Sequence, residues 1–169
     1  MLDPTLRSLL SLYKALKDQI RVLDRELLTS VRQSAVCRLL MTIPGVGPLT
    51  ALAFVSTVDD PKRFARSRSV GAYFGLTPCR YQSGELDTSR GISKCGDSLM
   101  RTYLFEAATT LLTRVEKSSA LKAWGLRLAK HSGMKKAKIA VARKLAVMMH
   151  CMWQTGEPFR WSQPEQAAV

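Results

Sequence analysis

The sequence predicts an all-α protein, in which an N-terminal coiled-coil helix leads into a compact helical domain with one serine- and glycine-rich loop. Apolar residues recur every three or four positions along most of the chain, which is the spacing of one helix face. No strand-length segment alternates apolar and polar residues, and no longer repeat recurs. A chain of 169 residues with 46% hydrophobic content has room for one core. We therefore expect a connector helix at 1–36, one helical domain at 37–161 and a disordered tail at 162–169.

The first segment carries the narrow apolar stripe of a coiled coil. Its apolar residues alternate spacings of three and four and are Leu6, Leu9, Tyr13, Leu16, Ile20, Leu23 and Leu27. Because this stripe covers only about two positions in seven, it favours pairing with another copy of the chain. The alternative is an amphipathic helix that packs on its own domain. We expect a homo-oligomer held by this helix.

A glycine-rich turn, PGVG, separates two predicted helices within residues 39–58. The pattern resembles a helix-hairpin-helix motif, in which glycines permit a tight turn and backbone N–H groups at the second helix face a phosphate. The candidate backbone contacts are Gly45, Val46 and Gly47. A plain helical corner without a ligand is the alternative interpretation.

Residues 80–101, RYQSGELDTSRGISKCGDSLMR, form the least apolar stretch of the domain and end in the first turn of a helix that Asp97 caps. We expect a functional loop here. The acids near it are few and both histidines lie far along the chain, so the sequence predicts no metal site. Two chemistries remain, namely a cradle of backbone N–H groups for phosphate, or a serine that attacks phosphorus. The cations available to either are Arg80, Arg90, Lys94 and Arg101.

The net charge points to a polyanionic partner. The chain has 26 Lys and Arg against 13 Asp and Glu, a formal charge of +13, and residues 102–161 alone hold eleven bases and three acids. The last predicted helix, which follows a turn at Gly133, begins with a basic cluster. Its predicted nucleic-acid contacts are Lys135, Lys136, Lys138 and Arg143, with Lys144 beside them. A solvated charged face is the alternative for any one of these residues.

Other protein classes are disfavoured by the sequence. No run of 18 or more apolar residues occurs, and the N-terminus lacks the layout of a signal peptide. The four cysteines form no CxxC pair and have no histidines at zinc-site spacing, so we expect reduced, structural thiols. These features predict a soluble cytoplasmic protein that is not associated with a membrane, and the net charge favours association with the nucleoid.

The order of motifs resembles the C-terminal transposase domain of the DEDD insertion-sequence transposases and recombinases. The motifs are IPGVGPLTA, then FGLTP, then SG followed by GISKCGDSLMRTYLFEAA, and finally ARKLAVMMHCMW with GEPF. This family includes pilin-gene inverting enzymes and bridge-RNA-guided recombinases. The resemblance covers residues 39–159, and the succession of motifs is more specific than any one of them.

In this family, the resemblance implies a two-part active site. An N-terminal RuvC-like domain supplies four acids that hold Mg²⁺, and the transposase domain supplies a serine that becomes joined to DNA through a phosphoserine bond. The serine of the SG step is Ser83; Ser93, beside Lys94, is the second candidate and Ser89 the third. Arg80, Lys94 and Arg101 are the candidate ligands of the scissile phosphate. A guide RNA is a further partner that the resemblance implies.

The sequence departs from the family pattern before residue 39, where a RuvC-like domain does not fit. We therefore expect a fragment or a truncated protein, inactive in strand cleavage on its own. Glu85 and Asp87 stand where basic residues would suit a phosphate, and Cys95 stands where we expect arginine. The alternative function is a non-catalytic helix-hairpin-helix module for DNA or RNA binding and oligomerisation.

Overall fold

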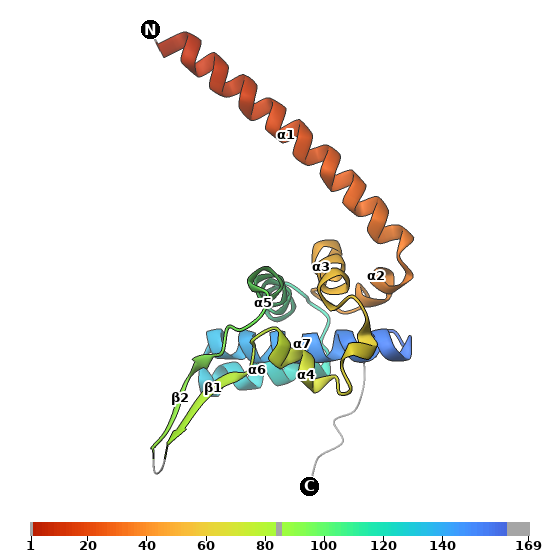
Figure 1. Ribbon diagram of the computed structural model, residues 1–169, viewed down its shortest axis with the longest axis vertical. Coiled ribbons are helices and arrows are strands. Elements are labelled where there is room, and N and C mark those ends of the chain that lie inside the picture. Colours follow the sequence, from red (N-terminus) through yellow and green to blue (C-terminus); the bar gives the residue numbers. More distant parts are fainter. Residues whose placement is uncertain (1, 84–85, 162–169) are drawn as a thin grey trace.

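The computed structural model describes residues 2–83 and 86–161, with side chains at 3–79 and 91–161. The predicted all-α class is confirmed: within these residues, seven α-helices and one short 3-10 helix accompany a single two-stranded sheet (Figure 1). In chain order the elements are α1 (Leu2–Gln33), α2 (Ala35–Leu40), α3 (Pro48–Val58), the 3-10 helix η1 (Pro61–Arg63), α4 (Arg68–Tyr73), β1 (Pro78–Ser83), β2 (Leu86–Ile92), α5 (Ser98–Thr113), α6 (Ala120–Ser132) and α7 (Met134–Thr155).

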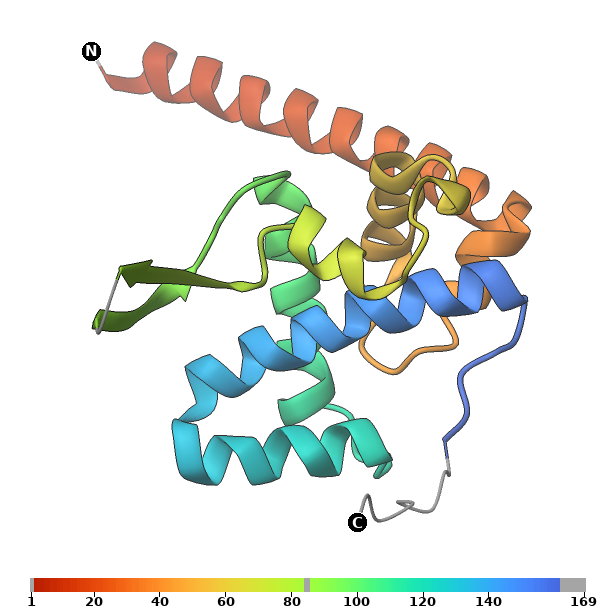
Figure 2. The same ribbon diagram turned by 60° about the horizontal axis from the view of Figure 1, so that its bottom comes forward.

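Helix α7 is the centre of the core. It contacts α2, α4, α5, α6 and η1, and it crosses the middle of the domain in Figures 1 and 2. Small side chains on its inner face let the neighbouring helices approach closely, and larger ones fill the remaining space. The buried residues of α7 are Ala137, Val141, Ala142, Leu145, Ala146, Met149, His150 and Met152.

His150 is the polar member of this buried face and ties α7 to the turn before α4. Its Nε2 lies 2.8 Å from the carbonyl oxygen of Pro61, and its Nδ1 lies 3.0 Å from the Ser67 hydroxyl. Because a carbonyl can only accept, Nε2 carries the proton and Nδ1 accepts from the hydroxyl. Both ring nitrogens of a fully buried side chain are thus satisfied.

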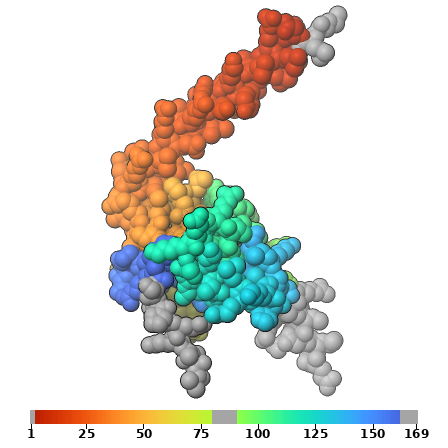
Figure 3. Space-filling model, turned by 180° about the vertical axis from the view of Figure 1, so that it is seen from behind, coloured from red at the N-terminus to blue at the C-terminus, as the bar shows by residue number. Residues whose placement is uncertain are grey.

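Helix α1 projects from the domain as a single long helix (Figures 1 and 3). Its predicted apolar stripe is uncovered: the six stripe residues between Leu6 and Leu23 are 53% to 62% exposed. Only the end of the helix packs on α2 and α3, through the half-buried Leu27 and the buried Val31. Packing of the stripe on its own domain is therefore limited to the last turns. The predicted pairing with a second copy stays a prediction.

Residues 78–83 and 86–92 pair as two β-strands, so the expectation of an irregular loop without strands in this part of the chain was wrong. Strands β1 and β2 pair antiparallel, from Pro78 opposite Ile92 to Ser83 opposite Leu86. The hairpin stands away from the helices (Figure 2). A strand shows an apolar alternation in sequence only when one of its faces packs on a core. This hairpin is held by backbone pairing and has no such pattern.

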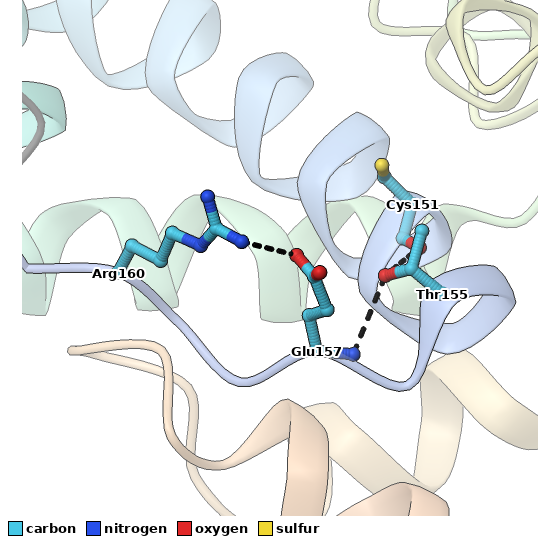
Figure 4. A network of polar contacts seen from close by, with 4 residues as sticks. All are labelled: Cys151, Thr155, Glu157 and Arg160. Carbon is cyan, nitrogen blue, oxygen red and sulfur yellow. Dashed lines mark hydrogen bonds and ion pairs between the residues drawn. The ribbon is translucent and has the colours of Figure 1, made fainter.

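The chain turns back across the domain after α7 (Figure 4). The Thr155 hydroxyl accepts a hydrogen bond from the N–H of Glu157 at 3.3 Å, and the Glu157 carboxylate pairs with Arg160 at 2.9 Å. The N–H of Phe159 then donates to the Thr42 hydroxyl at 3.0 Å. The GEPF motif thus ties the end of α7 to the turn between α2 and α3. The predicted tail at 162–169 lies outside the described residues.

Candidate nucleic-acid interface

The hairpin separates the three candidate serines. Ser83 ends β1, Ser89 lies within β2 opposite Arg80, and Ser93 follows β2 and pairs through its N–H with the Thr77 carbonyl. A strand rises about 3.3 Å per residue, so Ser83 lies roughly 20 Å from Ser93. At this separation, Ser83 and Ser93 cannot belong to the same reaction centre. The side chains of residues 80–90, including Arg80, Ser83, Asp87, Ser89 and Arg90, and both residues 84–85, lie outside the description.

The root of the hairpin is fixed by close backbone packing between the FGLTP and SKCGD motifs. Gly75 has φ +66°, and a Cβ there would lie 2.1 Å from the Cys95 carbonyl oxygen. Gly96 has φ +84°, and a Cβ there would lie 2.0 Å from the Tyr73 carbonyl oxygen. The N–H of Lys94 donates to the Gly75 carbonyl at 3.1 Å. Both glycines are required because, at each of them, the backbone of the facing segment occupies the space that a side chain would need.

Arg101, a predicted phosphate ligand, braces this root. Its Nη1 donates to the carbonyl oxygens of Phe74, Cys95 and Gly96 at 3.3, 3.1 and 3.0 Å. Lys94 lies in the same turn with φ +57° and an exposed side chain. Contact of either cation with a scissile phosphate stays a prediction. In the described contacts, Arg101 orients the hairpin.

A cavity of about 710 Å³ opens between the hairpin root, α4, α6 and α7. We call it the cation groove, after the four basic residues that line it: Arg68, Lys136, Arg143 and Lys144. The indole of Trp124 faces the same space, with the Lys144 ammonium 4.2 Å from its ring centroid. No carboxylate is among the described lining residues. A concave, basic and partly aromatic surface is suited to nucleic acid.

The groove contains part of the basic cluster predicted on α7. Lys136 and Arg143 lie on its wall, whereas the Lys138 ammonium lies 5.6 Å from the Phe105 ring centroid on α5. Lys135 is exposed and does not line the groove. The cluster is split because residues spaced by seven share a helix face and those spaced by two do not.

Sequence reasoning placed Lys144 beside the predicted contacts of the basic cluster, but it assigned neither Arg68 nor Trp124 to a site. Lys136, Arg143 and Lys144 have the spacing of one helix face, which separates them from the other cations of the cluster. Trp124 is half-buried and lines the groove. The sequence around Arg68 does not predict its place in the groove, because Arg68 reaches the groove only through the packing of α4 on α7.

The PGVG turn forms the tight corner between α2 and α3. Gly45 has φ +90°, and a Cβ there would lie 2.5 Å from the Ala107 carbonyl oxygen of α5. Gly47 caps α3, with Pro48 as the first helical residue and open space where a Cβ would lie. Val46 is buried. Phosphate binding by this turn stays a prediction.

Within the described ranges, no group of three or more His, Cys, Asp and Glu side chains converges as metal ligands would. The helices described there include none with the length and hydropathy needed to cross a membrane.

Proteins similar to this chain include transposases for insertion sequence elements and pilin gene-inverting proteins. It is 35% identical over 138 residues to a transposase for insertion sequence element IS1111A from Coxiella burnetii, a match that covers 81% of the chain and 38% of that protein. It is 36% identical over 137 residues to a transposase for IS1328 from Yersinia enterocolitica, covering 79% and 40% respectively. A pilin gene-inverting protein of Moraxella lacunata is 28% identical over 123 residues, covering 72% and 38%.

Residues 37–125 match the model of the transposase family IS116/IS110/IS902, and the chain belongs to this family. The resemblance that the motifs indicated is thereby confirmed. The chain spans about two fifths of the length of these curated relatives. The matched range includes the hairpin, its root and Trp124, whereas the groove residues of α7 lie beyond it.

Proposed function

We propose that this chain is the DNA-binding, serine-bearing domain of an insertion-sequence recombinase, and that the hairpin presents Ser83 to the DNA backbone. The observation that carries the proposal is the hairpin's construction: its root is fixed by Gly75, Gly96 and Arg101, and Ser83 ends the strand that leaves this root. A rigid base with a projecting reactive end is suited to placing one hydroxyl against an extended polymer.

In the proposed reaction, the Ser83 Oγ attacks a phosphorus of the DNA backbone. Its proton passes to a base, one P–O bond of the phosphodiester breaks, and a DNA hydroxyl end leaves with a proton. The product is a DNA–serine phosphodiester, so one phosphodiester replaces another. Attack by a hydroxyl of a second DNA strand releases Ser83 and completes the exchange without an added energy source.

The activating groups would come from outside the described residues. A serine hydroxyl is a weak nucleophile unless a base or a metal ion assists the loss of its proton. The described residues offer no metal-ligand cluster, and the family resemblance places Mg²⁺ on the acids of a RuvC-like domain. The isolated chain is therefore expected to bind DNA without cleaving it.

The uncovered stripe of α1 supports a second proposal, that two copies pair through this helix. The stripe residues from Leu6 to Leu23 are more than half exposed, and they continue the heptad spacing that places one helix against an identical one. Pairing would place two hairpins on one DNA assembly. A guide RNA is a further candidate partner, bound by the same basic surfaces.

The direct test supplies an N-terminal RuvC-like domain and Mg²⁺, and uses a suicide DNA substrate that traps the joined strand. A protein–DNA adduct should appear on a denaturing gel and vanish in Ser83→Ala. Ser93→Ala and Ser89→Ala, at the root and in β2, are matched controls and should retain it. An adduct that survives Ser83→Ala refutes the assignment of Ser83, whereas the absence of any adduct with the wild-type serine would leave the non-catalytic binding module as the function.

Duplex binding by the isolated chain tests the basic surface separately. Lys136→Gln and Arg143→Gln should each reduce the slope of log affinity against log salt by about 1, because each removes one phosphate contact. Lys14→Gln, on the projecting α1, is a charge-matched control and should leave the slope unchanged. Unchanged slopes in both groove variants would exclude the groove as a phosphate-binding surface.

A further inference from the structure

We propose that the cation groove holds one unpaired nucleotide of a single-stranded nucleic acid, with its base against Trp124 and its phosphates against Arg68, Lys136 and Arg143. The inference rests on the proposed function, because strand exchange exposes unpaired nucleotides beside the reacting phosphate. It specifies what the groove binds, namely an unpaired nucleotide, whereas the basic residues alone would indicate only a general site for duplex phosphates.

The shape of the groove favours a base over a double helix. Its volume of about 710 Å³ lies within the usual range of small-ligand sites, roughly 300–1,000 Å³. Much of its wall is apolar, formed by Leu76, Pro78, Ile92, Ile139, Ala140 and Val147. A duplex presents phosphates and groove edges, and its base faces are stacked inside. Only an unstacked base can place an apolar face against this concave wall.

Trp124 offers the stacking surface. One face of its indole is turned to the groove, where the Lys144 ammonium lies 4.2 Å from the ring centroid. Base stacking on an aromatic side chain is stronger than an exposed cation–π contact. A nucleobase can therefore replace the ammonium on the ring. Lys144 then becomes available to the phosphate of the same nucleotide.

The cations are placed around this aromatic wall. Arg68 comes from α4, and Lys136 and Arg143 lie about two turns apart on the same face of α7. Gly71 of α4 makes room for Arg143, whose Cγ lies 3.0 Å from where a Cβ on that glycine would stand. Among the described residues, no carboxylate pairs with these cations, so their charge is available to phosphates.

The groove lies at the foot of the hairpin. Pro78, which begins β1, and Gly91 and Ile92, which end β2, form part of its lining. Ser83 is at the far end of β1, roughly 17–20 Å along the strand. A nucleic acid that occupies the groove and also reaches Ser83 would have to run along the hairpin.

The test measures the fluorescence anisotropy of the full chain with labelled oligothymidylate of about twelve nucleotides, oligouridylate of the same length, and a duplex. Trp124→Leu, which keeps apolar bulk, should weaken single-strand binding about tenfold to a hundredfold and leave duplex binding within about twofold. Trp124→Phe, which keeps a stacking ring, should bind single strands within about threefold of wild type. If Trp124→Leu loses more affinity for oligothymidylate than for oligouridylate, the groove prefers DNA; if it loses more for oligouridylate, the groove prefers RNA. Either result supports the nucleotide pocket.

Equal losses for single strands and duplex, or no loss for single strands, would overturn the inference. If Trp124→Leu fails to fold, the pocket can be tested in the wild-type chain by photocrosslinking to oligothymidylate, with the crosslinked residues identified by peptide mass spectrometry. Crosslinks on Trp124 or its groove neighbours support the pocket, and crosslinks found only elsewhere contradict it. If the groove does not bind single strands as proposed, the formation of a Ser83–DNA adduct is unaffected. If the groove binds single strands but Ser83 forms no adduct, only the proposed chemistry is refuted.

Discussion

Replacing Gly75 with alanine places a methyl group where the backbone of Cys95 already lies. The added Cβ would be 2.1 Å from the Cys95 carbonyl oxygen and 2.5 Å from its nitrogen. Because φ is +66°, the left-handed backbone alone costs about 1–2 kcal/mol. Relief of the clash also displaces the Lys94 N–H from the Gly75 carbonyl, a bond worth about 1 kcal/mol. The lower entropy of the unfolded alanine chain returns about 0.4–1 kcal/mol.

Adding about 1 kcal/mol or more for the displaced turn gives a loss of about 3 kcal/mol in the free energy of unfolding. For a chain of this size, the melting temperature should fall by about 6–12 °C, measured by far-ultraviolet circular dichroism. Two glycines separate the contributions. Gly156→Ala has φ +72° and open space, and should lose about 2–4 °C; Gly47→Ala, with φ −95° and open space, should melt near wild type. If Gly75→Ala melts like Gly156→Ala, the interlocked hairpin root is refuted.

Three further predictions concern other contacts. His150→Ala should lower the free energy of unfolding by about 2–4 kcal/mol in urea, because it empties a buried site and removes the bonds to Pro61 and Ser67; a loss below about 1 kcal/mol would contradict this. Arg101→Gln should destabilise the chain by about 1–2 kcal/mol, whereas unchanged stability with weaker DNA binding would instead favour a phosphate role. Deleting residues 2–24 should reduce the mass in light scattering to a monomer with an unchanged melting temperature; an unchanged mass would exclude α1 as the pairing element.

Features set by local contacts were predictable from the sequence. Asp97 was expected to cap the following helix, and its carboxylate accepts from the Met100 N–H at 2.9 Å at the start of α5. The turn expected at Gly133 separates α6 from α7. Each depends on residues within one or two turns of each other, so the side-chain chemistry in the sequence is sufficient.

The hairpin and the groove depend on contacts that the sequence pattern does not record. The strands pair through backbone groups, which every residue carries, and the packing of Gly75 against Cys95 joins motifs twenty residues apart. The groove brings Arg68 beside Arg143 only after α4 has packed on α7. The glycines of the FGLTP and SKCGD motifs are compatible with close backbone packing, but the sequence does not show that these two segments pack against each other.

We propose above that the hydroxyl at the end of β1 becomes joined to DNA. The most direct measurement digests the trapped adduct, formed with a RuvC-like domain and Mg²⁺ present, and identifies by mass spectrometry the residue that carries the nucleotide. We expect a phosphodiester on Ser83, in the peptide that spans the hairpin. A nucleotide on Ser93, at the hairpin root, or on any residue outside the hairpin would contradict it.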